Sequence, residues 1–380
     1  KTFDSQLQDP TYSKSPLKLT IDLSIQAAVE HVLEGGMRLL NAKGAAAILM
    51  EVDTGRIISL ASLPDFDPNH RPNLPSRGSA AESPLFNKAI QGVYELGSTF
   101  KIFTVAQALE LGLVDPKTKI NTKGPIRIGG HKINDYRSNG PELPVWEIIT
   151  ESSNLGTARI AKMIGPEKQR EFLSSLGFSK PTTIEMIEAN GGKPLLPKRW
   201  NELETMTISY GHGLSATPLH LATGYATLAN GGRLVNPTLL QEVKPVLGPR
   251  IISKEVAENS LTMLRGVVTG GTASLADVDG YFVGGKTGTA DKPSSQGGDD
   301  KEKNITNFAS IFPINEPKYV LVVTLDEAQD TSGPEPKRTA GWTAVPVSAE
   351  IIARVAPLLG LRPKFDNHST IGITLSNWQE

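Results

Sequence analysis

Apolar positions along the chain follow strand-like and helix-like spacings, and the strand-like segments lie towards both ends of the sequence. Two apolar runs, 45–52 and 56–63, are joined by Asp53-Thr54-Gly55, which predicts an antiparallel hairpin with the glycine at the left-handed turn position. Residues 17–21 alternate as a short strand. Further strands are predicted at 281–283, 307–313 and 319–325.

Helical spacing dominates the middle of the chain. Asp22 can cap a helix whose apolar positions recur every three or four residues, and Gly35 and Gly36 interrupt or end that helix. A second helix is predicted over 98–111, where Gly112 is placed to stop it. Other helices are predicted at 145–151, 155–164, 166–176, 218–229, 253–268 and about 347–359.

This order of elements predicts a mixed α/β (α+β) architecture, in which one antiparallel sheet is covered by helices and carries an inserted helical subdomain. Residues 64–97 form a long loop region, and the polar segment 291–304 is expected to be mobile. The predicted organisation is a linker at 1–16 and one domain at 17–380, with sheet-containing parts at 17–64 and 253–380 and a mainly helical part at 65–252.

Composition narrows the class of protein. The 380 residues suffice for two or three units or one large domain. With 39 basic and 40 acidic residues scattered along the chain, no nucleic-acid face is expected. The absence of cysteine excludes disulfides, thiolate catalysis and cysteine metal sites, and leaves the compartment open.

No apolar stretch approaches the roughly 20 residues that a membrane-spanning helix requires. The chain begins at Lys1 without a basic and apolar leader, so we expect either that a targeting segment was removed or that this is the excised soluble part of a longer protein.

Three short motifs carry the candidate chemistry. Ser98 and Lys101 lie three residues apart at the start of a predicted helix, which places hydroxyl and amine on one face. The same spacing recurs at Ser15 and Lys18, so this pair alone is unspecific. The only S-x-N of the chain, Ser152-Ser153-Asn154, and its only K-T-G, Lys286-Thr287-Gly288-Thr289, follow in the order that penicillin-recognising serine enzymes use.

A serine hydroxyl becomes a nucleophile only when a base takes its proton, and Lys101 can be that base for Ser98 only while it is neutral. Burial and a second cation, for which Lys286 is the candidate, would both lower the pKa of Lys101. Ser98 at a helix N-terminus also gains free backbone N–H groups and the positive end of the helix dipole.

The K-T-G segment is expected along a strand edge, where a peptide can bind as an added strand. The Lys286 charge and the hydroxyls of Thr287 and Thr289 suit a terminal carboxylate, and Gly288 lets a substrate backbone approach closely. The backbone N–H groups of Ser98 and Thr289 would form an oxyanion hole. Ser152 would relay a proton to the leaving amine, and Asn154 would hold a substrate amide.

Together these residues resemble the transpeptidase domain of class B penicillin-binding proteins over nearly the full length of the chain. The resemblance extends to Ser62-Leu63-Pro64-Asp65-Phe66-Asp67-Pro68-Asn69, Tyr210-Gly211-His212-Gly213-Leu214, Thr217-Pro218-Leu219, Gly341-Trp342 and Val345-Pro346-Val347. The division-specific, septal members are the most similar. One departure is Leu96, where the family commonly has proline, and we expect it to alter only the local turn.

The resemblance implies a penicillin-binding protein and serine β-lactamase-like fold, with a five-stranded antiparallel sheet flanked by helices. It implies that Ser98 attacks a D-Ala-D-Ala stem peptide, expels D-Ala and passes the acyl group to a neighbouring amine in septal cell-wall synthesis, and that β-lactams acylate the same serine. Tyr210 and His212 are candidates for the wall of the substrate cleft. No cofactor or metal is expected.

The resemblance also implies a place in the bacterial envelope. The full protein would lie at the periplasmic face of the inner membrane, held by an N-terminal anchor absent from this chain. It would work with a membrane glycan polymerase and other division proteins.

Several alternatives remain open from the sequence. A D,D-carboxypeptidase, a β-lactam sensor and a serine β-lactamase share the nucleophile, although the E-x-x-L-N segment of one β-lactamase class is absent. Residues 280–287 match the phosphate-loop pattern G-x4-G-K-T, and 320–327 resemble the acidic strand of a nucleotide hydrolase. A phosphate loop requires a helix that begins at its lysine, whereas Gly288 and Pro293 follow here. An inactive scaffold would be expected to have lost a motif residue, and none is lost.

Overall fold

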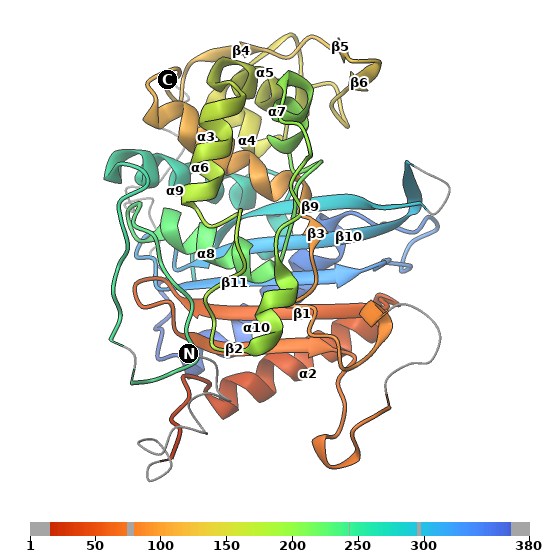
Figure 1. The fold of residues 1–380 in the computed structure, drawn as a ribbon, viewed down its shortest axis with the longest axis vertical. Coiled ribbons are helices and arrows are strands. Elements are labelled where there is room, and N and C mark those ends of the chain that lie inside the picture. The colour runs from red at the N-terminus through yellow and green to blue at the C-terminus, as the bar shows by residue number, and fades with distance from the viewer. Residues whose placement is uncertain (1–15, 74–79, 243, 295–297, 366–380) are drawn as a thin grey trace.

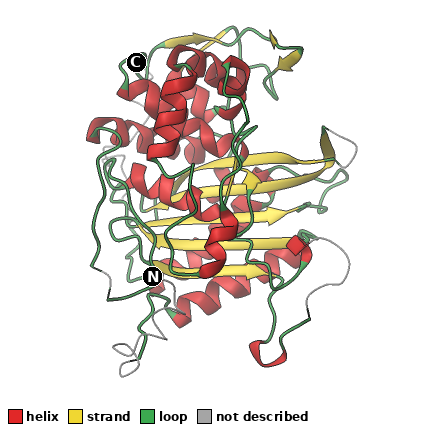
Figure 2. Cartoon of the chain, in the orientation of Figure 1, coloured by secondary structure: helices red, strands yellow, loops and turns green. Residues whose placement is uncertain are grey.

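The computed structural model describes residues 16–73, 80–242, 244–294 and 298–365. A helical block lies above an extended sheet, and the strands run across the view (Figures 1 and 2). The five-stranded sheet has the order β2-β1-β11-β10-β9, with antiparallel pairing throughout. These strands are β1 (Gly44–Glu51), β2 (Ile57–Leu63), β9 (Gly284–Pro293), β10 (Asp299–Phe312) and β11 (Tyr319–Asp326). The predicted sheet is confirmed.

The central strands β1 and β11 form the core of the sheet. Nearly every side chain of both strands is buried, as expected for strands that are covered on both faces. Helices α2 (Leu23–Leu39) and α10 (Ala344–Leu358) pack on each other and on one face of the sheet. Helix α8 (Pro218–Ala229) contacts β1, β10 and β11, and Figure 1 shows it in front of the sheet with α10 behind.

The helical block stands next to β9. It contains α3 (Lys101–Glu110), α4 (Val145–Thr150), α5 (Asn154–Ile164), α6 (Pro166–Ser175), α7 (Glu202–Ile208) and α9 (Lys254–Thr269). Three two-stranded pairs join β3 (Tyr94–Glu95) to β8 (Ser215–Ala216), β4 (Lys119–Asn121) to β7 (Glu142–Pro144), and β5 (Ile126–Ile128) to β6 (His131–Ile133). Because α8 lies within 65–252 and packs on the sheet, the helical part and the sheet share one core, and the division of 17–380 into two parts stays a prediction.

Two predicted strands are wrong, and the polar segment 291–304 contains regular structure. Residues 17–21 form one isolated bridge, between Leu19 and Leu240, instead of a strand. The strand predicted at 281–283 begins only at Gly284, because Phe282 has a left-handed φ of 41° that interrupts an extended backbone. The polar segment 291–304 lies mostly in β9 and β10, paired across the sheet, whereas residues 295–297 of it lie outside the described part.

Helix α2 shows why a glycine pair need not end a helix. Its N-cap is Asp22, as predicted, but it continues through Gly35 and Gly36 to Leu39. A Cβ atom at Gly36 would lie 2.6 Å from a methyl group of Val347 on α10. Glycine at this position therefore allows the two helices to approach closely.

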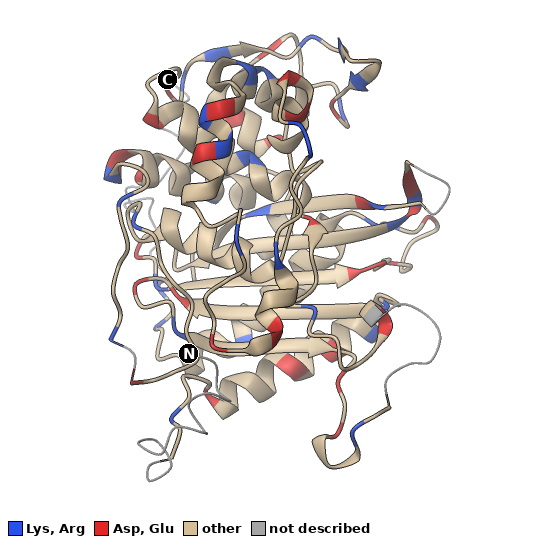
Figure 3. Ribbon diagram, in the orientation of Figure 1, with Lys and Arg blue, Asp and Glu red and all other residues tan. Residues whose placement is uncertain are grey.

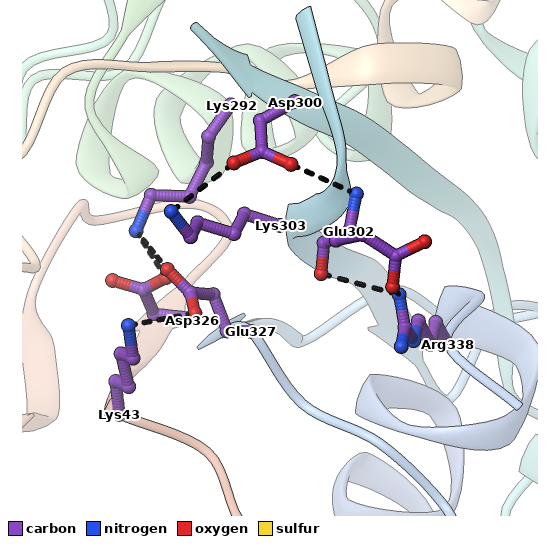
Figure 4. Close-up of polar contacts among 8 residues, drawn as sticks. All are labelled: Lys43, Lys292, Asp300, Glu302, Lys303, Asp326, Glu327 and Arg338. Atoms are coloured by element: carbon purple, nitrogen blue, oxygen red, sulfur yellow. Dashed lines mark hydrogen bonds and ion pairs between the residues drawn. The ribbon is translucent and has the colours of Figure 1, made fainter. Parts of the chain in front are cut away.

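Charged groups of both signs are spread over the molecule (Figure 3). At one end of the sheet they form two neighbouring groups of polar contacts (Figure 4). There Lys292 of β9 donates to Asp326 and Glu327 at 2.8 Å each, and Lys43 lies 2.8 Å from Glu327. These ion pairs join the ends of β9 and β11 to the turn before β1. No helix among the described residues is long and apolar enough to cross a membrane.

Candidate active site

Ser98 lies at the start of a continuous helical segment. A single 3₁₀ turn, Gly97–Phe100, leads directly into α3, so the helix predicted from residue 98 is confirmed and ends at Glu110. The Thr99 hydroxyl donates to the Leu96 carbonyl at 2.8 Å and holds the entry to this turn. Ser98 is half-buried, whereas Lys101, one turn later, is completely buried.

An aromatic cluster anchors this helix. Phe100 and Phe103 pack on Phe178 with ring centroids 4.9 and 5.4 Å away, and Phe103 meets Tyr225 edge-on at 5.6 Å. The Tyr225 hydroxyl donates to the Thr99 carbonyl at 3.0 Å. Because Thr99 directly follows Ser98, the predicted nucleophile, this bond ties the backbone beside Ser98 to α8.

The S-x-N motif forms the turn between α4 and α5. Ser153 is the N-cap of α5, and its hydroxyl accepts from the Gly156 N–H at 2.9 Å. The same hydroxyl donates to the Asp135 carboxylate at 2.7 Å, and the Leu155 N–H donates to that carboxylate at 2.9 Å. Held in this way, Ser152 adopts a left-handed φ of 59°, which is unusual for a serine and marks a backbone that its surroundings constrain.

Both lysines of the motifs converge on Ser152. Lys101 donates to the Ser152 hydroxyl at 3.0 Å and also to its carbonyl, while Lys286 donates to the same hydroxyl at 2.9 Å. Helix α3, the α4–α5 turn and strand β9 are far apart in sequence. The structure thus joins the three motifs through one hydroxyl.

Burial governs the charges of this site. It lowers the pKa of Lys286 to about 7. For Lys101, burial first and repulsion from Lys286 second lower the pKa well below its ordinary value, while Asp135 opposes this shift. A lysine with a lowered pKa is neutral in a larger fraction of molecules near pH 7, which is what a general base requires.

The K-T-G motif lies in β9, the edge strand of the sheet next to the helical block. The Thr287 hydroxyl lies 2.7 Å from the Thr272 hydroxyl, and the Thr289 hydroxyl accepts from the Ala340 N–H at 3.0 Å. A Cβ atom at Gly97 would lie 2.7 Å from the Thr289 carbonyl oxygen. The backbones before Ser98 and at Thr289 are therefore in direct contact, so the two proposed oxyanion donors lie on adjacent segments.

The remaining candidates flank this arrangement. Asn154 donates its side-chain amide to the Asn134 carbonyl at 3.0 Å. Tyr210 and His212 meet edge-on with ring centroids 5.7 Å apart, and the His212 Nδ1 lies 2.6 Å from a carboxylate oxygen of Glu95. Burial raises the pKa of Tyr210 to about 12, so its hydroxyl stays protonated at neutral pH.

The phosphate-loop alternative is wrong. Lys286 lies inside a β-strand, with Gly284 to Pro293 all extended, so no helix N-terminus is present at this lysine to hold a phosphate. Asp326 and Glu327 pair with lysines of the ion cluster. No group of three or more histidine, cysteine or acidic side chains that could hold a metal occurs in the described ranges.

Sequence reasoning missed Asp135 and Glu95. Asp135 lies 17 residues before Ser152 in a loop and belongs to none of the three motifs. Glu95 precedes Ser98 by three residues, but its partners His212 and Gly213 are more than 100 residues away. Only the folded chain brings these carboxylates to the motifs that they hold.

Comparisons with known proteins agree with this geometry. The family model of the penicillin binding protein transpeptidase domain matches residues 45–352. The chain is 34% identical over 361 residues to the probable peptidoglycan D,D-transpeptidase FtsI of Caulobacter vibrioides, covering 92% of this chain and 60% of the relative. It is 31% identical over 349 residues to peptidoglycan D,D-transpeptidase FtsI of Escherichia coli K12, covering 91% and 57%.

A solved structure shows the same fold. The apo transpeptidase domain of penicillin-binding protein 3 from Burkholderia pseudomallei superposes with a TM-score of 0.80 at 31% identity, covering 94% of this chain and all of that one. The chain spans about 60% of the length of the curated relatives that it matches first. With the family model covering most of the chain and its motifs meeting at one hydroxyl, this protein belongs to the penicillin-binding protein transpeptidase domain family.

Proposed function

We propose that this chain is the catalytic part of a peptidoglycan D,D-transpeptidase that acts through a Ser98 acyl-enzyme. The observation that carries the proposal is the pair of buried lysines on one hydroxyl, with Lys101 and Lys286 at 3.0 and 2.9 Å from the Ser152 Oγ. The names of the Caulobacter and Escherichia relatives support the same reaction.

Neutral Lys101 accepts the Ser98 proton as the serine oxygen attacks the D-Ala-D-Ala carbonyl. The N–H groups of Ser98 and Thr289 stabilise the oxyanion. When the peptide bond breaks, the proton passes through the Ser152 hydroxyl to the nitrogen of the departing D-Ala. An amine of a neighbouring stem peptide then attacks the ester and loses a proton by the same route, and the Ser98 hydroxyl is restored.

Other motif residues hold the donor peptide beside this centre. Lys286, Thr287 and Thr289 bind its terminal carboxylate along the β9 edge, and Gly288 leaves room for its backbone. Asn154 binds a substrate amide, and Tyr210 and His212 line the cleft. β-Lactams acylate Ser98 in place of the stem peptide.

The division-specific role rests on the names of several relatives, among them the FtsI proteins of Caulobacter vibrioides and Escherichia coli. We also propose that this chain lies at the periplasmic face of the inner membrane. There it would work with a membrane glycan polymerase and other division proteins. A D,D-carboxypeptidase, a β-lactamase and a β-lactam sensor would form the same kind of acyl-enzyme on Ser98. They differ from a transpeptidase only in what happens to that acyl group afterwards.

Incubation with benzylpenicillin, followed by intact mass over hours, tests the proposal. We expect one stable adduct that is lost in Ser98→Ala. Absence of an adduct in the unaltered chain would refute the acyl-enzyme, and rapid loss of the adduct would identify a β-lactamase. Transfer of a D-Ala-D-Ala donor to an added amine, in place of release to water only, separates the transpeptidase from a carboxypeptidase.

A further inference from the structure

Glu95 lies in β3, three residues before Ser98, and β3 pairs with β8 at Ser215–Ala216. Its carboxylate makes two contacts with one loop. One oxygen lies 2.6 Å from the His212 Nδ1, and the other accepts from the Gly213 N–H at 2.7 Å. Strand β3 and the 210–213 loop are thereby joined by a two-point contact, which we call the Glu95 clamp.

The loop that the clamp holds lies directly on the backbone of the nucleophile. Gly211 has a φ of 89°, and a Cβ atom there would lie 2.0 Å from the Gly97 carbonyl oxygen. Gly97 in turn touches the backbone of Thr289. A continuous stack of backbone therefore runs from the 210–213 loop through Gly97 to β9.

We propose, building on the acyl-enzyme function above, that Glu95 is a positioning residue that holds the 210–213 loop against Gly97 and so fixes the spacing between the Ser98 and Thr289 N–H groups. Both N–H groups must point at one oxygen for the oxyanion to be stabilised. A displacement of about 1 Å in such a site costs on the order of 100-fold in rate.

The clamp also has a charge of its own. His212 is faced by Glu95 of β3, by Asp291 of β9 and by Asp299 of β10. The hydrogen bond to Glu95 raises the pKa of His212 above its ordinary value of 6.5, while burial opposes this rise. Loss of the His212 proton removes the attraction between two opposite charges and leaves a hydrogen bond from a neutral donor to the carboxylate. The clamp is therefore strongest below the raised pKa of His212 and weakens as pH increases through it.

This behaviour separates positioning from a purely structural role. If Glu95 only stabilised the fold, its replacement would lower the unfolding midpoint and leave the acylation rate of the folded protein unchanged. If it positions the oxyanion donors, the wild-type acylation rate falls by about 2- to 5-fold on the alkaline side, which matches the loss of one partly exposed ion pair. Replacement of His212 by a residue that does not titrate removes that alkaline fall.

The test measures the second-order rate of acylation by benzylpenicillin from pH 5.5 to 9.5, with thermal unfolding of each variant. The variants are Glu95→Ala, Glu95→Gln and His212→Gln, and Glu350→Gln is the matched control because it breaks an exposed 2.6 Å contact with Arg354 on α10. We expect Glu95→Ala to react about 10- to 100-fold more slowly while folded. Glu95→Gln should stay within about 3-fold of wild type and, like His212→Gln, should lose the alkaline fall.

The inference is wrong if folded Glu95→Ala reacts within 2-fold of wild type, if wild type has no alkaline fall, or if the fall persists unchanged in His212→Gln. If Glu95→Ala does not fold, the pH profile of Glu95→Gln alone tests the inference. Loss of the alkaline fall supports it, and a fall like that of wild type contradicts it. A wild-type chain that benzylpenicillin does not acylate would instead overturn the proposed function, so the two failures are distinguishable.

Discussion

Asp135 offers the sharpest test of how the S-x-N turn is held. Its carboxylate accepts from the Ser153 hydroxyl at 2.7 Å and from the Leu155 N–H at 2.9 Å. Hydrogen bonds to a charged group contribute about 1.5–3 kcal/mol each. Asp135 is partly exposed and water replaces part of what is lost, so we expect Asp135→Ala to reduce the free energy of unfolding by about 2–4 kcal/mol.

The same change should slow acylation. Without the carboxylate, the left-handed backbone of Ser152 is free to relax, and its hydroxyl moves away from the two lysines. A shift of about 1 Å predicts a reaction roughly 100-fold slower. Urea unfolding gives the stability, and stopped-flow acylation with a fluorescent penicillin gives the rate. Asp115→Ala is the control, because Asp115 accepts from two backbone N–H groups at 2.7 and 2.8 Å in an exposed turn.

Asp135→Asn isolates the charge. The amide oxygen can still accept from Leu155, and the amide nitrogen can donate to the Ser153 hydroxyl, so the turn is retained. Asp135 raises the pKa of Lys101 against burial and Lys286, and its neutralisation therefore lowers that pKa further. More Lys101 is then neutral at low pH, so the acidic limb of the acylation profile moves to lower pH. Two results would refute this reasoning. One is an acidic limb that moves to higher pH in Asp135→Asn, and the other is a folded Asp135→Ala that is acylated as fast as Asp115→Ala.

Two further variants test neighbouring parts of the site. Lys286→Gln removes a charge that lowers the pKa of Lys101, so the acidic limb of the acylation profile should move to higher pH, opposite to Asp135→Asn. The acylation rate should also be about 100-fold lower, because the Ser152 hydroxyl loses the Lys286 donor. An acidic limb that does not move would contradict the coupling between the two lysines. Tyr225→Phe leaves the Thr99 carbonyl without its buried partner, and we expect urea unfolding to show a loss of about 1–2 kcal/mol, whereas an unchanged midpoint would mean that α8 does not hold the nucleophile turn.

The parts of the fold that the sequence predicts best are those where local patterns decide the outcome. Asp22 and Gly112 mark helix ends through chemistry within a few residues, and both lie where predicted. The reason for glycine at position 36 within α2 is instead Val347, more than 300 residues away, which leaves no room for a Cβ atom. The strand start at Gly284 depends on the left-handed backbone of Phe282, for which an aromatic residue gives no signal.

The candidate site divides in the same way. The motifs predict Ser98, Lys101, Ser152 and Lys286, because each chemical role requires one residue type at a fixed local spacing. Asp135 could not be predicted, since a carboxylate in a polar loop carries no local mark of the partner it will meet after folding. What the sequence misses is therefore the layer of residues that orients the reacting groups.

In the mechanism that we propose, the two lysines on Ser152 explain how one hydroxyl can serve both halves of the reaction. A hydroxyl has one proton to donate and two lone pairs that accept. While Lys101 is charged, the Ser152 oxygen accepts from both lysines, as the distances of 3.0 and 2.9 Å allow. Once Lys101 is neutral, its lone pair is free to accept the proton of Ser98, and Lys286 still donates to the Ser152 hydroxyl.

In the proposed mechanism, the direction in which the Ser152 proton moves follows the charge of Lys101. After Lys101 takes the proton of Ser98, it becomes a donor to Ser152 again, and the Ser152 proton is free to move to the leaving nitrogen. Burial makes the charged form of Lys101 unfavourable, so the proton is passed on instead of being retained. In the proposed reaction, the low pKa of Lys101 would therefore favour both the attack of Ser98 and the departure of the amine.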